Sequence, residues 1–355
     1  MNDIPQTTIG VDLGDNKHHL CILDQGGKAV FEGTLPNTRE ALLALAAQYP
    51  GARVALEVGT HSPWVGELLA GEGLDVLVAN ARKLRAVYQN ERKCDAFDAR
   101  MLAKIARLDP ELLSPITHIS QEAMAERLVL GNRDRLVTHR KALVQSVRSS
   151  VKSLGHRIAA CSAEAFPRRV RQSFARDERG AGALLAAIEP VLAAIETMNR
   201  SIAELDSQID ALAREKHPSA GRLRQIPGVG PVTSLAFVLA VEDPSRLAAT
   251  RDIGAYFGLV PRRDQSGASD KALGISKAGN AYVRTLLVQC AQHILGPHGP
   301  ESDLRRFGLR LAERGGRGAK KKAIVAVARK LAVVMLSLWK SGEDYRPLRA
   351  TPTMA

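Results

Sequence analysis

The chain has 355 residues, 45% of them hydrophobic, and is long enough for two or three domains with separate cores. Its formal net charge of +13 favours a polyanionic partner, most simply nucleic acid, and the aromatic content of 4% argues against base stacking as the main binding mode. The four cysteines form no CxxC pair, which argues against disulfides and a zinc site. We expect a cytoplasmic protein that does not cross a membrane, because no signal pattern opens the chain and residues 323–339 are interrupted by Arg329 and Lys330.

The first distinctive feature is a carboxylate beside a buried strand. Residues 7–11 are mostly β-branched and predict such a strand, and Asp12 follows them before a turn that contains Gly14. An ionised Asp left there without a partner costs about 3–5 kcal/mol. A cation or a hydrogen-bond network should therefore compensate it, although many such residues only cap or form turns.

The following elements predict a mixed sheet. Strands at 19–23 and 29–35 are joined by a hairpin at Gly26-Gly27, and Asn37 caps a helix that ends near residue 47. A strand at 53–57, a helix at 63–70, a strand at 75–78 and a helix that opens within residues 93–100 and ends near residue 108 complete the set. This order is that of a ribonuclease H-like (RuvC-like) domain, whose central strands carry acids that meet at one edge of the sheet.

Four carboxylates are expected to converge at that edge: Asp12, Glu57, Asp95 and Asp98, the last two on one helical face. Such a cluster repels itself unless divalent ions neutralise it, and oxygen ligands suit Mg²⁺ or Mn²⁺. Two such ions stabilise phosphodiester displacement. The alternative is that Asp95 caps the helix and Asp98 complements its dipole.

Two further interpretations concern this region. Residues 9–14 also resemble the first phosphate loop of actin-like ATPases and sugar kinases, but the further glycine-rich loops of those proteins are missing from the sequence. Cations flank the acid set and could hold a nucleic-acid backbone or form a solvated helix face; they are Arg82, Lys83, Arg85, Arg92, Lys93, Arg100 and Lys104.

The middle of the chain predicts two long helices. The first spans 121 to about 160 and carries many Arg and Lys, and a basic loop is expected around Pro167. The second has a heptad seam typical of a coiled coil, formed by Ile188, Val191, Ile195, Met198, Ile202, Leu205, Ile209 and Leu212. An intramolecular hairpin and dimerisation both explain this seam.

The last third predicts a helical region that binds phosphates. Gly228 and Gly230 lie in a turn that suggests a helix-hairpin-helix, although a tight interhelical turn explains them too. A polar loop at 258–267 contains Ser266, with Ser269 and Ser276 as competing nucleophiles. The cations around this loop, expected to bind nucleic acid, are Arg262, Arg263, Lys277 and Arg284, and a separate basic segment with the same expected role contains Lys320, Lys321 and Lys322.

Taken together, these motifs resemble the DEDD-motif insertion-sequence transposases, and the resemblance covers nearly the whole chain. It rests on the four acids, the heptad helix, the Ile-Pro-Gly-Val-Gly at 226–230, and the Gly-Leu-Val-Pro, Ser-Gly and Ile-Ser-Lys-x-Gly-Asn run that ends at Arg284. It implies that Ser266 forms a transient phosphoserine with DNA, that the acids bind Mg²⁺ (or Mn²⁺), and that a structured bridge RNA guides the enzyme. It also implies a tetramer whose active site combines two protomers.

The sequence therefore predicts an α/β plus α protein that is a DNA transposase or recombinase. We expect a ribonuclease H-like catalytic domain at 1–112, a helical coiled-coil region at 113–217, a C-terminal helical transposase domain with the serine at 218–345, and a loose tail at 346–355. Expected partners are donor and target DNA, a structured non-coding guide RNA, and further copies in a dimer or tetramer, in association with the nucleoid. The rival interpretations are a metal-dependent junction-resolving nuclease without a covalent intermediate and a non-catalytic nucleic-acid-binding scaffold.

Overall fold

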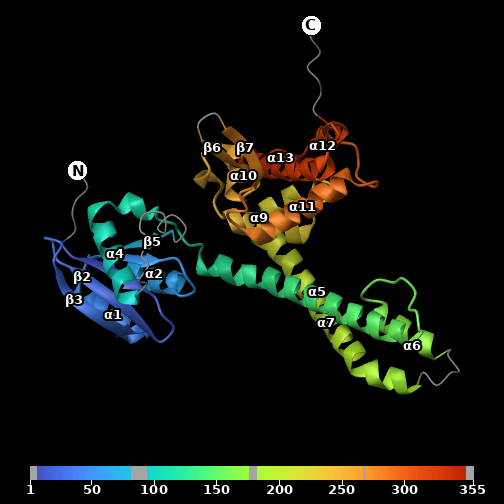
Figure 1. The fold of residues 1–355 in the computed structure, drawn as a ribbon, viewed down its shortest axis with the longest axis horizontal. Helices are drawn as coiled ribbons and strands as arrows, with labels where there is room; N and C mark the ends of the chain where they lie inside the picture. Colours follow the sequence, from blue (N-terminus) through green and yellow to red (C-terminus); the bar gives the residue numbers. More distant parts are fainter. Residues whose placement is uncertain (1–5, 81–93, 176–181, 267–268, 349–355) are drawn as a thin grey trace, which may run out of the picture. The chain divides into compact units, whose positions relative to one another are not determined.

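The computed structural model describes residues 6–80, 94–175, 182–266 and 269–348, with the backbone alone over 263–272. The chain divides into two compact units, Met1–Ser120 and Gln121–Ala355 (Figure 1). The first is a mixed sheet with helices, and the second is almost entirely helical. An α/β plus α fold is therefore confirmed at this level.

The first unit is built on a five-stranded sheet of order β3-β2-β1-β4-β5. Strands β1, β4 and β5 are parallel, and β2 and β3 are antiparallel to their neighbours. This order is consistent with the predicted ribonuclease H-like domain. The elements are β1 (Thr8–Asp12), β2 (Lys17–Leu23), β3 (Ala29–Pro36), α1 (Arg39–Gln48), β4 (Arg53–Glu57), α2 (Ser62–Gly71), β5 (Asp75–Ala79), α4 (Asp95–Leu108) and a 3₁₀ turn (Pro110–Leu113).

Successive side chains of β1 point to opposite faces of the sheet, and helices cover both faces. Ile9 and Val11 pack into the core with α1 and α2, and the intervening residue of β1, Gly10, faces α4. A Cβ at Gly10 would overlap the Ala99 carbonyl of α4, so glycine is required for α4 to lie this close to β1. This contact fixes the start of α4 near the end of β1.

One predicted cap is wrong. Thr38, and not Asn37, caps α1, because its side chain accepts a hydrogen bond from the Ala41 amide. Asn37 instead donates to the carbonyls of Gly14 and Asp15, at 3.1 and 3.0 Å. It ties the end of β3 to the loop that follows Asp12.

The second unit begins with a helical hairpin made by α5 (Gln121–Ser153), α6 (Phe166–Phe174) and α7 (Gly182–Glu215). Two expectations are wrong here. The first helix ends at Ser153 rather than near residue 160, with Gly155 at φ +88° in the turn beyond it. The predicted basic loop around Pro167 is helix α6, which Pro167 starts because proline fits the first turn of a helix.

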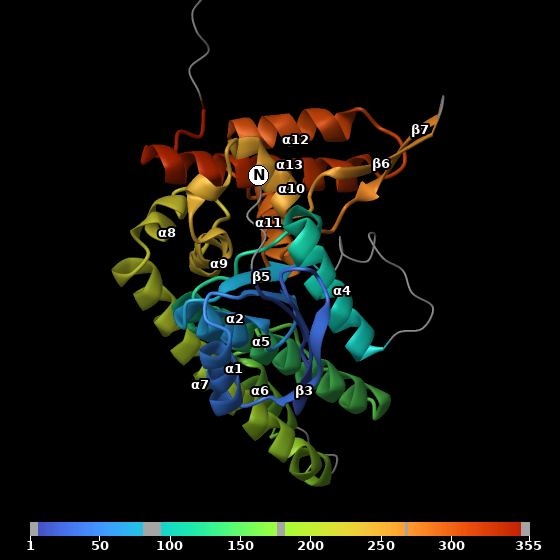
Figure 2. The same ribbon diagram turned by 90° about the vertical axis from the view of Figure 1, so that its left-hand side faces the viewer.

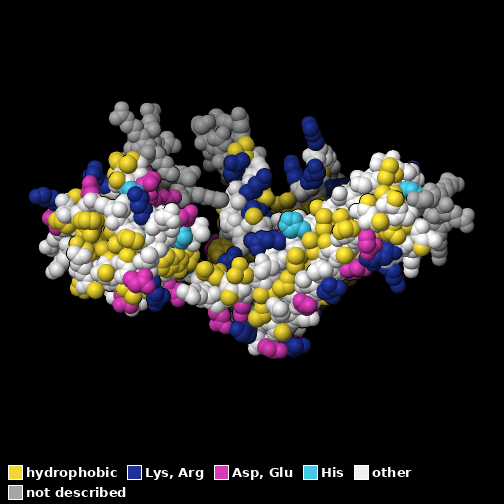
Figure 3. All heavy atoms as spheres, turned by 90° about the horizontal axis from the view of Figure 1, so that it is seen from below, with side chains coloured by type: hydrophobic (Ala, Val, Ile, Leu, Met, Phe, Trp, Pro, Cys, Tyr) yellow, Lys and Arg dark blue, Asp and Glu magenta, His cyan; other side chains and the backbone are white. Residues whose placement is uncertain are grey.

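The hairpin closes within one chain, since α7 packs against α5. Cross-helix pairs run antiparallel, from Lys216 with Glu122 to Arg133 with Asp206. In the predicted seam, the side chains of Ile188, Ile195, Ile202 and Ile209 are buried, whereas the alternate seam positions, Val191 to Leu212, are only half-buried. The seam is therefore not fully covered by α5. On the face of the molecule that Figure 3 shows, hydrophobic side chains are interspersed with charged ones.

Among the described residues, α7 is the one helix long and apolar enough to cross a membrane by length and composition. That test is also passed by helices in soluble proteins, and α7 carries a row of charges.

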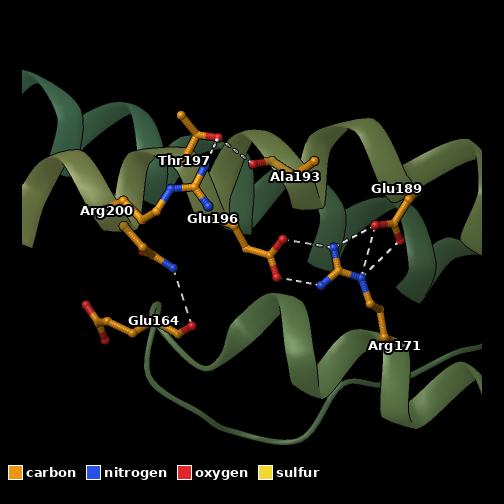
Figure 4. A network of polar contacts seen from close by, with 8 residues as sticks. Glu164, Arg171, Glu189, Ala193, Glu196, Thr197 and Arg200 are labelled. Atoms are coloured by element: carbon orange, nitrogen blue, oxygen red, sulfur yellow. Dashed lines mark hydrogen bonds and ion pairs between the residues drawn. The ribbon is translucent and has the colours of Figure 1, made fainter.

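A single guanidinium from α6, that of Arg171, bridges Glu189 and Glu196 on α7 at 2.6 and 2.5 Å (Figure 4). This bidentate network docks α6 onto α7.

The C-terminal part of the second unit surrounds α9, all of whose residues from Thr233 to Val241 are buried. The elements are α8 (Pro218–Leu223), α9 (Pro231–Val241), 3₁₀ turns (Pro244–Arg246 and Thr250–Asp252), α10 (Ile253–Tyr256), β6 (Pro261–Ser266), β7 (Ser269–Ile275), α11 (Ala281–Leu295), α12 (Asp303–Glu313) and α13 (Ala319–Ser341). The predicted polar loop at 258–267 is wrong in part, because β6 and β7 form an antiparallel hairpin. Figure 2 shows this hairpin projecting beyond the helices.

Several hydrogen bonds attach the end of the described chain to the second unit. The side chain of Gln225 donates to Asp344 Oδ1 at 2.9 Å and accepts from the Tyr345 amide at 2.8 Å. The Pro347 carbonyl accepts a hydrogen bond from the Asp303 amide at 2.8 Å. Residues 349–355 of the predicted loose tail lie outside the described residues.

Candidate functional site

The four predicted acids come from three elements that meet on one face of the sheet. Asp12 ends β1 and Glu57 ends the neighbouring parallel strand β4, in which Leu56 pairs with Val11. Asp12 and Glu57 lie on the same side of the sheet as Gly10 does, because side chains alternate between the two faces along a strand. Their side chains therefore point to the face of the sheet that α4 covers. Asp95 and Asp98 lie in the first turn of α4, where Cys94 and not Asp95 occupies the N-cap position.

The electrostatics of Asp12 show that the four acids act on one another. Burial, and after it the negative charges of Asp95, Asp98 and Glu57 in that order, together raise the pKa of Asp12 from 3.8 to about 6. The imidazole of His19 opposes this shift. A carboxyl that titrates near neutrality among three other carboxylates is what a cation-binding or proton-transferring site requires.

The acid cluster has the donor chemistry of a divalent-metal site but not its closed geometry. Among residues 6–80, 94–175 and the other described segments, no three His, Cys, Asp or Glu side chains are grouped closely enough to hold a metal ion. The all-oxygen donor set fits a hard cation such as Mg²⁺. Asp12, Glu57, Asp95 and Asp98 are the residues that would hold it, after side-chain rearrangement.

The sequence interpretation missed His19. This residue is the direct cross-strand partner of Asp12, and its Nε2 lies 3.8 Å from Asp95 Oδ2. It therefore bridges the strand acid and the helix acid. The signal was available in the β1–β2 hairpin, because the antiparallel register places residue 19 opposite residue 12 and on the same face.

The loop after Asp12 is held by a second group of side chains. His61 contacts Asp15 Oδ1 through Nε2 at 2.9 Å. The indole of Trp64 donates to His61 Nδ1 at 3.2 Å, so the Nε2 of a neutral His61 carries the proton that Asp15 accepts. His18 accepts from the Gly14 amide at 3.3 Å, and burial lowers its pKa. The loop that follows Asp12 is thus held by His18 and His61, in addition to Asn37.

The flanking cations predicted beside the acids are only partly described. Arg82, Lys83, Arg85, Arg92 and Lys93 lie outside the described residues. Arg100 forms a bidentate pair with Glu32, at 2.5 and 2.6 Å, so its guanidinium is engaged within the protein. Its predicted contact with a nucleic-acid backbone would have to compete with that pair.

Ser266 is the last residue of β6 and pairs with Ser269 across the turn of the hairpin. The backbone places it at the tip of the projecting hairpin, and the side chains of Ser266, Ser269 and Arg263 lie outside the described part. Ser276, the other competitor, lies at the opposite end, where its amide donates to the Val260 carbonyl at 2.8 Å. Ser276 is therefore separated along the hairpin from Ser266 and Ser269, which lie opposite one another at its tip.

Arg284 holds the base of this hairpin. Its guanidinium Nη1 donates to the carbonyls of Phe257 and Ala278, at 2.9 and 2.8 Å, and so joins the segment before β6 to the segment after β7. Gly279, at φ +68°, lets these segments touch, since a Cβ there would overlap the Tyr256 carbonyl. Arg284 is a structural clamp in this conformation, and its predicted phosphate contact stays a prediction.

The other predicted nucleic-acid ligands all belong to the second unit. Arg262, Lys277, Lys320, Lys321 and Lys322 are exposed, the last three at the start of α13. Gly228 and Gly230 form the turn between α8 and α9, as expected for a hairpin between helices. Gly228 has φ +89°, which favours glycine, and the turn packs against His293 of α11.

Family models match both the region of the acids and the region of the serine hairpin. A family model for DEDD transposases of the IS110 type matches residues 9–155, a range that contains the four acids. A second model, described as Transposase IS116/IS110/IS902 family, matches residues 220–305, which contain Ser266 and the hairpin. The two matches together span most of the chain.

Individual relatives agree with these matches. The chain is 29% identical to the transposase for insertion sequence element IS1111A of Coxiella burnetii, over 95% of this chain and 91% of the relative. It is also 29% identical to a probable family 20 transposase of Pseudomonas aeruginosa, over 96% and 98% of the two chains. A transposase for insertion sequence element IS1328 of Yersinia enterocolitica is 26% identical over 81% and 83%. The chain therefore belongs to the IS110/IS116 family of insertion-sequence transposases, enzymes that recombine DNA.

Proposed function

We propose that this transposase cuts and rejoins DNA through Ser266, with divalent-metal assistance from Asp12, Glu57, Asp95 and Asp98. The observation that supports this most directly is the raised pKa of Asp12, which has the other three acids among its causes. Carboxylates with these mutual effects favour a bound cation. Mg²⁺ or Mn²⁺ bound there would stabilise the negative charge that develops on the reacting phosphate.

In the proposed reaction, the hydroxyl oxygen of Ser266 attacks a backbone phosphorus, and one phosphorus–oxygen bond to the sugar breaks. The serine proton leaves and the released sugar oxygen gains one, so the phosphodiester is exchanged and not hydrolysed. A second sugar hydroxyl reverses the exchange on another strand. Placement of Ser266 at the tip of a projecting hairpin is compatible with access to a large substrate.

The wider assignment includes partners and domain roles. We propose residues 1–112 as the catalytic acid domain, 113–217 as a coiled-coil region and 218–345 as the serine domain. A dimer or tetramer would combine acids and serine from different protomers, and the half-buried seam positions of α7 leave apolar surface for such an assembly. A structured non-coding guide RNA is supported by the family resemblance and by the net charge of +13.

The test is a search for the covalent intermediate. The protein is expressed with the DNA that flanks its gene, denatured and digested, and the peptides are analysed for a nucleotide on Ser266. Ser266→Ala is the essential control, and Ser269→Ala is the matched one because that residue lies directly opposite in the hairpin. We expect the adduct in wild type and in Ser269→Ala and not in Ser266→Ala.

Other results would change the assignment. Free DNA ends without any adduct would make the protein a metal-dependent nuclease of the junction-resolving kind. An adduct that disappears only in Ser269→Ala would move the nucleophile. As a test of the acids, Asp12→Ala should abolish metal-dependent cleavage and leave DNA binding within about twofold of wild type, since one charge contributes little to binding; equal loss of both would make the cluster structural.

A further inference from the structure

The second unit contains a groove at the base of the β6–β7 hairpin, with a volume of about 860 Å³. This volume lies within the range of small-molecule sites, about 300–1,000 Å³. Its walls include Pro261, the first residue of β6, and Ile275, the last residue of β7. The groove therefore adjoins the element that carries Ser266.

The floor of the groove is apolar. Leu259 and Ile275 contribute from the hairpin base, and Val325, Ala326 and Val333 contribute from α13. Ala326 follows Val325 directly, and Val333 comes seven residues after Ala326, a spacing that places all three on one face of the helix. All three are only half-buried, so other parts of the second unit cover this face of α13 only in part. Leu273, 44% exposed, forms an apolar lip.

The rim of the groove is cationic. Five Lys or Arg residues line it, namely Arg251, Lys321, Lys322, Arg329 and Lys330. All five side chains are exposed, and no Asp or Glu is among the described residues that line the groove. Lys330 also lies 4.4 Å from the ring centroid of Phe307, which closes one side. The occupant that fits carries several negative charges and an apolar face.

Duplex DNA does not offer this combination, because pairing and stacking hide the base faces and leave phosphates outside. An unpaired strand offers both, with bases that enter an apolar groove and phosphates that pair with the rim. An acidic peptide would pair with the cationic rim of the groove. It would fill the apolar floor only where an apolar side chain stands among its acidic residues. The DNA substrate of this family makes a single strand the better match.

We propose that the groove between α13 and the base of the β6–β7 hairpin binds unpaired nucleotides of a DNA strand, with bases on the apolar floor and phosphates on the rim cations. This deepens the proposed function, on which it rests for the role of the hairpin. The bound segment would be the unpaired strand next to the phosphate that Ser266 attacks. Binding itself needs neither metal nor cleavage.

The test compares two labelled probes by fluorescence anisotropy with the full-length protein in EDTA. One is an eight-nucleotide oligo-dT strand, and the other is a hairpin duplex with a matched number of phosphates. Ala326→Phe fills the floor, and Leu273→Ser removes an exposed part of the lip with little risk to folding. Leu309→Ser, on an equally exposed leucine of α12 outside the groove, is the matched control.

We expect Ala326→Phe to weaken binding of the single strand by at least about fivefold, as loss of one base contact would do. Leu273→Ser should weaken it in the same direction, and Leu309→Ser should leave it unchanged. Duplex binding should change less than twofold in all three. The logarithm of the single-strand binding constant falls linearly with the logarithm of the salt concentration, and Lys321→Gln should make this slope shallower by about 0.7. Arg310→Gln, on α12 outside the groove, should leave the slope unchanged.

The proposal is overturned if both groove variants bind the single strand as wild type does, or if they weaken the duplex equally. Groove variants that lose an oligo-U strand and keep oligo-dT would assign the groove to RNA, and loss of an acidic peptide alone would assign it to protein. Because these measurements need no cleavage, they fail or succeed independently of the Ser266 adduct.

Discussion

Replacing Asp12 by Asn should stabilise the metal-free protein, although it should destroy the activity. The pKa of Asp12 is raised in the folded state, from 3.8 to about 6, by burial and by the neighbouring carboxylates. The folded protein therefore holds this proton more tightly than the unfolded chain does. Stability from this group is complete below pH 4 and is lost as the pH rises through 6.

The magnitude follows from the shift. About two pKa units correspond to about 3 kcal/mol at 1.36 kcal/mol per unit. Because the Asp12 side chain is only partly buried, solvent screening reduces this, and we expect a gain of about 1–2 kcal/mol for Asp12→Asn at pH 8. The melting temperature of the first unit should rise by about 3–8 °C. At pH 5 the gain should be about half as large, since much of the folded wild type is then protonated.

The assay is thermal unfolding of wild type and Asp12→Asn in EDTA at pH 8 and pH 5, followed by addition of Mg²⁺. Metal should raise the melting temperature of wild type more than that of the variant, because it binds the folded acid cluster. Glu40→Gln, an exposed acid in the first turn of α1, is a control for loss of one charge. A variant that melts at or below the wild-type temperature at pH 8 would refute the reasoning.

Three further changes test the architecture. Gly10→Ala should destabilise the first unit by about 1–3 kcal/mol, measured as a lower urea midpoint, because the new Cβ meets the α4 backbone; an unchanged midpoint would mean that α4 can move away. Arg284→Gln removes charged hydrogen bonds worth about 1.5–3 kcal/mol, and should speed amide exchange in the β6–β7 hairpin; exchange that rises equally in α7 would argue against a local clamp. Arg171→Ala should cost about 1 kcal/mol and free α6 from α7, with faster exchange in α6 as the readout and no change in the sheet of the first unit.

Periodic patterns decided most of what the sequence predicted correctly. The β-branched run of the first strand and the three-and-four spacing of α7 are local patterns, and each identified its element as buried in part or in full. The turn at Gly26-Gly27 also follows from nearby residues. The errors lie at element ends, such as Thr38 in place of Asn37 and the end of α5 at Ser153, where several adjacent residues compete for one role.

The sequence by itself determined the order of the elements, the presence of four acids on three of them, and the basic charge that indicates nucleic acid. Only the tertiary structure decided that His19 reaches Asp95, that Arg284 clamps the hairpin of Ser266, and that α7 closes on α5. Those contacts join residues that are distant in the chain or face one another across a register. Their energy depends on close packing, as at Gly10, where one missing Cβ lets α4 reach the strand of Asp12.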